Sequence, residues 1–179
     1  GMDATAPKNV TASGGKFAYP DDGAETPDAL QVVFEFDGFS MLWEHATGID
    51  LGPYQRDHGV AFIGNLGTLV VDRQKWEIYA ESENVDGRPE YLTPVLPVQR
   101  RDDDGGLDAH TQNFVECMKS REQPKCHPAI AARAAVTSHM GNISFKTGRR
   151  LAWNDKAGSF DGDSEATALL MPNYRSPWT

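Results

Sequence analysis

The chain has 179 residues, 39% of them apolar, with four Trp and eight Phe, so it can bury one sizeable core and we expect a single domain over residues 1–179. A formal net charge of −9 offers no basic surface to phosphates or anionic lipid headgroups, which argues against nucleic-acid and membrane partners. No apolar run approaches the ~20 residues that a membrane helix needs. We therefore expect a soluble protein, of the cytoplasm or the periplasm.

Two elements are expected in the first third of the chain. Residues 3–28 are rich in Pro, Gly, Asp, Ala and Thr, and residues 16–19 have a strand-like pattern, which predicts an edge strand within a loop. Two apolar runs within residues 29–45 are joined by Asp37-Gly38, a pair that favours the type I′ turn of a β-hairpin because both central residues need positive φ.

The two-residue turn also fixes the register of the hairpin. It predicts four opposed pairs on one face, namely Phe36 with Phe39, Phe34 with Met41, Val32 with Trp43, and Leu30 with His45. Every side chain on this face except that of His45 is apolar. We therefore expect the face to belong to the core.

A loop rich in glycine and proline, residues 47–59, follows the hairpin. Such loops tend to carry function when they stand over a scaffold. Three apolar runs, residues 60–63, 68–72 and 76–81, then predict an antiparallel meander. Residues 82–106 are rich in Pro, Glu, Asp and Arg, and we expect them to form an internal connector.

The apolar periodicity changes to helical spacing after residue 106. Apolar side chains recur every three or four positions over residues 107–118, with Asp108 placed to cap the helix. A second helix is expected to begin at Pro128 and to end at Gly148. A strand at 149–153 and a short helix at 164–170 follow. The order predicts an α+β fold, an open, mainly antiparallel sheet with helices packed on one face.

Three short triplets match, in order, the motifs of penicillin-recognising serine enzymes: Ser13-Gly14-Gly15-Lys16, Ser82-Glu83-Asn84 and Lys146-Thr147-Gly148. That chemistry needs the Ser and the Lys one turn apart on a helix, and the two intervening glycines oppose a helix. Lys146 also falls at a helix end rather than on a strand. Serine acyl transfer is therefore the most distant of the functions considered.

No nucleotide or metal fingerprint is evident. There is no G-x-G-x-x-G after a strand and no G-x-x-x-x-G-K-[ST], so we expect this chain alone to bind no cofactor. Asp161, Asp163 and Glu165 alternate like a fragment of a calcium loop but lack its full ligand set, and Cys126-His127 lacks a second ligand pair for zinc. We expect a solvated acidic turn and no metal site, with Cys117 and Cys126 as reduced thiols.

Two histidines and an arginine lie near the predicted loop. His45 ends the apolar face of the hairpin, so it either points into a cleft or is half-buried with a bond to a loop carbonyl. Arg56 and His58 lie within the loop and could meet an anionic or polyhydroxylated ligand, although exposed loop charges are the commoner case. No pairing of a base with a nucleophile is evident, so we name no catalytic residue.

Several segments of the chain occur together, in order, in one protein family. They are 7–15, Trp43-Glu44-His45, 64–71, Asn113-Phe114-x-x-Cys117 with Ser120-Arg121, SHMGNISFKTGRRLAWN at 138–154, Phe160-x-Gly162-Asp163, and Tyr174-Arg175-Ser176-Pro177-Trp178. Together they resemble the C-terminal part of the Gfo/Idh/MocA oxidoreductases, the glucose–fructose oxidoreductase and inositol dehydrogenase family. The likeness is greatest to the bacterial branch, whose members often act on sugars.

The resemblance implies a two-domain parent. An N-terminal Rossmann domain would bind NAD or NADP, while the domain seen here would shape the sugar pocket and use its sheet to form an oligomer. The family's cofactor turn and its catalytic residues precede the segment matched by residues 7–15, so they are absent from this chain. The isolated chain is therefore expected to be inactive.

The first hypothesis is a C-terminal substrate-side and oligomerisation domain of an NAD(P)-dependent sugar or polyol oxidoreductase, whose partners are its Rossmann domain, further copies of itself and the sugar. The alternative is a stand-alone, non-catalytic binding or assembly module. Long polar side chains beside aromatic faces suit a polyhydroxylated ligand. On that basis the candidate substrate-binding residues are His45, Arg56, His58, Tyr174 and Arg175.

Overall fold

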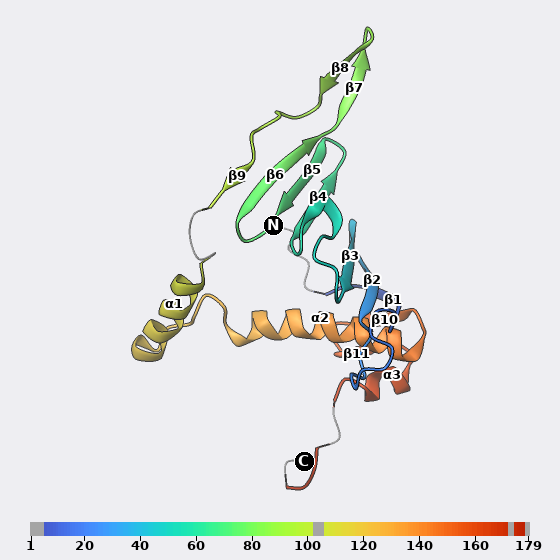
Figure 1. The fold of residues 1–179 in the computed structure, drawn as a ribbon. Helices are drawn as coiled ribbons and strands as arrows, with labels where there is room; N and C mark the ends of the chain where they lie inside the picture. Colours follow the sequence, from blue (N-terminus) through green and yellow to red (C-terminus); the bar gives the residue numbers. More distant parts are fainter. Residues whose placement is uncertain (1–5, 102–105, 172–173, 178–179) are drawn as a thin grey trace. The chain divides into compact units, whose positions relative to one another are not determined.

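The computed structural model describes residues 6–101, 106–171 and 174–177. These residues form two compact units, which we describe separately (Figure 1). The first unit comprises Gly1–Gly48 and Cys126–Thr179, and the second comprises Ile49–Lys125. The expectation that all 179 residues act as one domain stays a prediction.

The first unit is a five-stranded antiparallel sheet with a long helix against it. Its elements are β1 (Asn9–Gly15), β2 (Ala29–Phe36), β3 (Phe39–Ala46), α2 (Pro128–Thr147), β10 (Leu151–Asn154), β11 (Ser159–Phe160) and α3 (Ser164–Ala168). The strand order is β11-β10-β1-β2-β3, and α2 packs against β1. The core between them is formed by Val10, Leu30, Val32, Phe34, Met140, Ile143, Leu151, Phe160 and Ala166.

The predicted hairpin and its register are confirmed. Phe36 lies opposite Phe39, and Leu30 lies opposite His45. The turn between the strands places Gly38 at φ 82°. The expectation that the whole face is core holds for β2 and is wrong for part of β3, because Trp43 is 53% exposed. β3 is the edge strand of this sheet, whereas α2 packs against β1, two strands away.

The first strand lies earlier than the sequence pattern predicts. Residues 9–15 form β1, which pairs along its whole length with β2, whereas residues 16–19 form no strand. The backbone N–H groups of Phe17, Ala18 and Tyr19 instead donate to the carboxylate of Asp28. Those donors are therefore satisfied without a strand partner.

The second unit contains the predicted meander. Its elements are a 3-10 turn (Pro53–Gln55), β4 (Val60–Gly64), β5 (Gly67–Val71), β6 (Lys75–Ala80), β7 (Ser82–Val85), β8 (Arg88–Tyr91), β9 (Gln99–Arg100) and α1 (Leu107–Ser120). Strands β4, β5, β6 and β9 form one antiparallel sheet in that order, and β7 pairs only with β8. The three predicted strands of the meander correspond to β4, β5 and β6.

The segment expected to be a connector contains a β-hairpin. β7 and β8 are joined by Asp86-Gly87, with φ angles of 51° and 80°, which is the backbone of a type I′ turn. The charged and proline-rich composition of residues 82–106 obscured this second Asp-Gly pair. Residues 102–105 of the expected connector lie outside the described part of the chain.

The helices agree with the sequence pattern except at one cap. α2 begins at Pro128 and ends with Gly148 as its left-handed C-cap, as predicted. α1 begins at Leu107 with Gly106 as the N-cap, so Asp108 lies in the first turn instead of at the cap. The structure confirms the α+β class with mainly antiparallel sheets. In the described part of the chain, no helix combines the length and apolar character needed to cross a membrane.

Candidate functional site

In the first unit, His45 lies near the end of the edge strand β3. Its side chain is exposed, and its Nε2 lies 3.2 Å from the hydroxyl oxygen of Thr47. The half-buried alternative with a bond to a loop carbonyl is therefore wrong. An exposed imidazole at a strand end is accessible to a ligand, and its role in sugar binding stays a prediction.

Two other candidates of the first unit, Tyr174 and Arg175, lie in the C-terminal tail. Tyr174 is 54% exposed, and Arg175 is also exposed. Among the described residues, no hydrogen bond or ion pair joins either of them to His45. The structure therefore does not assemble these three candidates through direct polar contacts.

In the second unit, Arg56 is buried, unlike the rest of its loop. Only 6% of the residue is exposed, and its guanidinium makes ion pairs with Asp72, which follows β5, and with Glu77 of β6. Both carboxylates therefore bind one cation, which ties the loop to two strands. A buried cation that is paired in this way is costly to separate from either partner.

The electrostatics of this cluster favour the charged forms of Arg56 and Asp72. Burial lowers the pKa of Arg56, but the hydrogen bonds and charges of Asp72 and Glu77 outweigh burial and raise that pKa overall. Burial also raises the pKa of Asp72, whereas N–H donation from Gln74, Lys75 and Arg56 brings it below its ordinary value. The ion pair is therefore retained over the neutral pH range.

The backbone of the loop next to Arg56 is strained. Tyr54 and Gln55 have φ angles of 57° and 56°, which place two successive non-glycine residues in the left-handed region. The ring of Tyr54 lies 5.4 Å from that of Tyr79 on β6, with the ring planes tilted by 42°. The loop also exposes His58, whose Nδ1 lies 2.9 Å from a carboxylate oxygen of Asp57.

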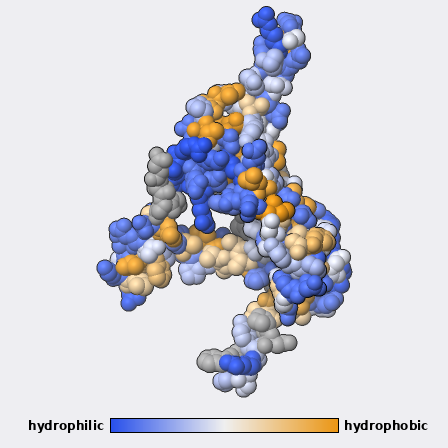
Figure 2. Space-filling model, in the orientation of Figure 1, coloured by the Kyte–Doolittle hydropathy of each residue, from blue (hydrophilic) through white to orange (hydrophobic). Residues whose placement is uncertain are grey.

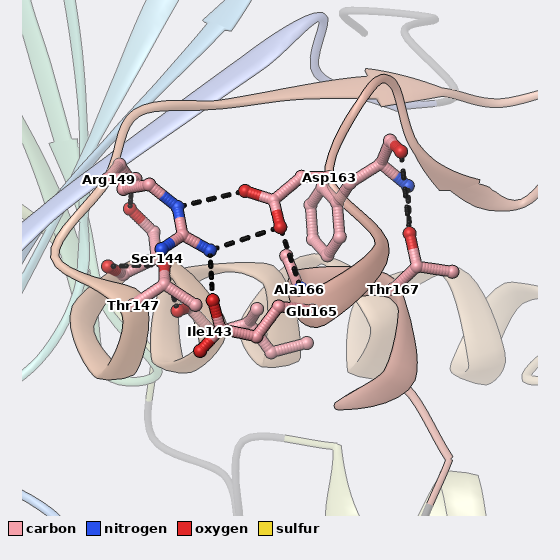
Figure 3. A network of polar contacts seen from close by, with 9 residues as sticks. Ile143, Ser144, Thr147, Arg149, Asp163, Glu165, Ala166 and Thr167 are labelled. Carbon is pink, nitrogen blue, oxygen red and sulfur yellow. Dashed lines mark hydrogen bonds and ion pairs between the residues drawn. The ribbon is translucent and has the colours of Figure 1, made fainter.

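Two of the acidic residues that resemble part of a calcium loop, Asp163 and Glu165, have structural partners (Figure 3). Asp163 is the N-cap of α3 and accepts a hydrogen bond from the N–H of Ala166 at 2.9 Å. Asp163 and Glu165 also bind the guanidinium of Arg149. Over the described residues, no group of three or more His, Cys, Asp or Glu is arranged to hold a metal ion.

The serine motif does not form a catalytic arrangement. Ser13 lies within strand β1, so it is not one helical turn from Lys16. The ammonium of Lys16 lies 2.6 Å from a carboxylate oxygen of Asp22 instead. A lysine held in this ion pair is not positioned to activate the serine.

The β4-β5-β6 sheet presents one face made only of apolar residues, which we call the apolar face. Strand register places Phe62, Leu69 and Ile78 in one row across the three strands, and their neighbours two residues away share that face. Its nine members are Val60, Phe62, Gly64, Gly67, Leu69, Val71, Trp76, Ile78 and Ala80. Phe62 is 50% exposed and Val60 is 53% exposed, and patches of apolar surface are visible on this unit in Figure 2.

No family model matches this chain, and no curated protein matches it. Three solved structures assigned as oxidoreductases are similar, YvaA from Bacillus subtilis and proteins from Bacteroides fragilis and Klebsiella pneumoniae, each with a TM-score of 0.53. The sequence identities are 11%, 12% and 13%, over 83%, 83% and 92% of this chain. The chain spans about half of those proteins, 47%, 48% and 47% of their lengths.

At these identities the likeness shows a shared fold. The chain is thus an α+β protein, and its fold is similar to that of about half of each of these three larger proteins, which are assigned as oxidoreductases. Two features were missed in the sequence, the pairing of Arg56 with Asp72 and Glu77 and the contact of Tyr54 with Tyr79. The polar turn after β5 was the one sequence feature that pointed to Asp72 as a loop residue, and no local pattern indicated Glu77 or Tyr79 as partners.

Proposed function

We propose that this chain is the substrate-side and assembly domain of an NAD(P)-dependent sugar or polyol oxidoreductase of the Gfo/Idh/MocA type. The observation that carries the proposal is the fold shared with about half of each of three proteins assigned as oxidoreductases. The sequence segments that resemble this family support the same assignment. The nucleotide would bind to residues outside these 179, because the chain has no glycine-rich nucleotide turn.

The substrate-side role would rest on exposed polar side chains. His45, His58, Tyr174 and Arg175 are exposed and carry groups that hydrogen-bond to hydroxyls. Arg56 has its guanidinium bound to Asp72 and Glu77, so it would contribute to sugar binding by holding the loop that carries His58.

A kinetic comparison in the two-domain parent tests this role. His58→Ala should raise the KM for the sugar several-fold and leave kcat nearly unchanged, because a lost ground-state contact weakens binding without altering the chemical step. His110→Ala is the matched control, since His110 is an exposed histidine of the same unit on α1. If both variants have the KM of the unmodified enzyme, His58 is not a substrate-binding residue.

The assembly role would rest on the apolar face of β4, β5 and β6. Monomeric proteins seldom expose a contiguous apolar area of this kind, and such areas commonly mark interfaces. None of the nine residues on the face is charged, so a second copy could approach without like-charge repulsion even though the chain carries a net charge of −9.

Light scattering at several protein concentrations tests the assembly role. The unmodified chain should be an oligomer, and Phe62→Glu should shift it to a monomer because a charge would be placed in the interface. Ile63→Glu is the matched control, since Ile63 is the next residue of β4, points to the opposite face and is 77% exposed. A monomeric unmodified chain would contradict the assembly role.

Titration of NAD(H) on the same sample separates this proposal from its alternatives. We expect no saturable binding of the nucleotide to the isolated chain, and binding only after a Rossmann domain is joined to it. Tight NAD(H) binding by the isolated chain would contradict the proposal that the nucleotide binds to residues outside this chain. Failure of a sugar to bind the joined protein would favour the stand-alone assembly module.

A further inference from the structure

Residues 49–58, which we call the strap, are held to the strands of the second unit by the buried side chain of Arg56, with the ring of Tyr54 lying against that of Tyr79. Arg56 is the one buried residue of the strap, Gly52 is partly buried and the others are exposed. Even the apolar members are open to solvent, with Ile49 61% and Leu51 68% exposed. Apolar packing therefore contributes little to holding the strap, and the ion pairs of Arg56 contribute most.

The anchored backbone has an unfavourable conformation. Tyr54 and Gln55 both lie in the left-handed region, which residues with a Cβ rarely adopt. Short main-chain bonds close the turn around them: the N–H of Gly52 donates to the carbonyl of Arg56 at 2.8 Å, and that of Gln55 donates to Gly52 at 3.1 Å. Such a conformation persists only where surrounding interactions enforce it.

The anchor itself is not fully satisfied. Arg56 Nε is buried and has no hydrogen-bond partner in the structure, while the two terminal nitrogens of the guanidinium bind Asp72 and Glu77. The cluster also contains two carboxylates for one cation. Two ion pairs therefore hold the strap closed, while the backbone strain and the unpaired donor are unfavourable contributions to the free energy of the closed state.

We propose that the strap is a conformational device that Arg56 fastens to β5 and β6, and that it opens when Arg56 loses either carboxylate. In the closed state Arg56 covers the carboxylates of Asp72 and Glu77, and Tyr54 lies against Tyr79. In the open state these two carboxylates become accessible, the Tyr79 ring loses its contact with Tyr54, and the backbone of Tyr54 and Gln55 relaxes. This inference does not depend on the proposed oxidoreductase function.

Limited proteolysis with trypsin on the full chain measures the opening directly. Trypsin cleaves after arginine only when that side chain enters its specificity pocket, and Arg56 is buried in the closed strap. Glu77→Gln should therefore increase the rate of cleavage after Arg56 by about tenfold or more, because it removes one partner of a buried cation. Glu90→Gln is the matched control, since Glu90 is exposed on β8 in the same unit, and it should leave the rate unchanged.

A second variant tests the strain. Gln55→Gly should decrease the cleavage rate after Arg56 by about fivefold, because glycine adopts the left-handed conformation without a steric penalty. An increase in that rate would show that no strain is stored at this position and would overturn that part of the proposal.

Mass spectrometry of the fragments distinguishes opening of the strap from unfolding of the unit. An increase in cleavage of Glu77→Gln over the unmodified chain that is confined to Arg56 supports the device. Equal cleavage after Arg56 in Glu77→Gln and in the unmodified chain would overturn it, as would an increase of the same size at the other lysines and arginines of the unit. Arg56→Lys provides an independent variant, because a single ammonium cannot span both carboxylates as the guanidinium does, and it should also speed cleavage after residue 56.

Discussion

The hydroxyl of Ser144 on α2 bridges β1 and the segment leading into β10. It accepts a hydrogen bond from the backbone N–H of Ala12 at 3.0 Å and donates one to the carbonyl oxygen of Arg149 at 2.7 Å. Strands β1 and β10 pair only at two positions, Asn9 with Ala152 and Val10 with Leu151. Continued pairing in the same register would place Ala12 opposite Arg149, so Ser144 links two backbone groups that the ladder leaves apart.

Ser144→Ala should destabilise the first unit by about 2 kcal/mol, because Ser144 is fully buried and the N–H of Ala12 and the carbonyl of Arg149 would each lose their partner. Urea denaturation monitored by circular dichroism measures the change. Ser138→Ala is the control, since Ser138 is an exposed serine of the same helix whose hydroxyl bonds only to a carbonyl of its own helix, and we expect a change within about 0.5 kcal/mol. Equal losses in the two variants would contradict the bridging role of Ser144.

The glycine of the first hairpin provides a second prediction. Gly38→Ala should destabilise the chain by about 1 kcal/mol, because Gly38 has φ 82° and a residue with a Cβ is strained there. Gly23→Ala is the matched control, since both glycines are exposed with open space around them and Gly23 lacks positive φ. Thermal unfolding compares the two, and a loss of equal size at position 23 would contradict the backbone explanation.

Local rules predicted those parts of the fold that local chemistry determines. Asp37-Gly38 fixed the register of its hairpin because the turn geometry has few solutions, and Pro128 and Gly148 marked the ends of α2. A second Asp-Gly pair at residues 86 and 87 carried the same information. Its charged surroundings suggested a connector, but the Asp-Gly turn forms a β-hairpin there despite that composition.

The misplaced features depend on contacts between residues far apart in sequence. Five of the seven residues of β1 are Asn, Ala, Ser or Gly, which have weak strand preference, and its place between β2 and β10 makes it a strand. Arg56 looked like an exposed loop charge because its partners lie 16 and 21 residues away. The candidate sugar-binding residues are the least predictable part, because no local pattern specifies which exposed side chains meet a ligand.

The N-terminus of α3 allows capping to be separated from ion pairing. Asp163→Ser retains an oxygen that can accept the N–H of Ala166 but loses the pairing with Arg149. Asp163→Ala loses both interactions. We expect the serine variant to have nearly the melting temperature of the unmodified chain and the alanine variant to melt about 3 °C lower, because exposed ion pairs contribute little and N-caps contribute more.

Glu165→Gln is the control for that series, because it removes only one exposed partner of Arg149 and should leave the melting temperature unchanged. Differential scanning calorimetry measures all three variants. A serine variant that melts as low as the alanine variant would show that the ion pair, and not the cap, stabilises this end of α3.

The last prediction concerns pH and Asp28. The N–H donors of Phe17, Tyr19 and Ala18 lower the pKa of Asp28 below its ordinary value of 3.8. As the pH falls, the unfolded chain therefore takes up a proton at this position before the folded chain does, which favours unfolding. The stabilisation by Asp28 is present above the ordinary pKa and is lost as the pH falls through the lowered pKa of the folded state.

Asp28→Asn should lower the urea midpoint at neutral pH, because a neutral amide offers a single oxygen to three N–H donors that now share two charged oxygens. The difference from the unmodified chain should be constant well above the ordinary pKa of 3.8 and should shrink as the pH falls through the lowered pKa of the folded state, where the carboxyl of the unmodified chain becomes protonated. Asp21→Asn is the control, since Asp21 is exposed in the same loop. A difference that stays constant down to the lowest pH would contradict the role of a charged Asp28 in organising residues 17–19.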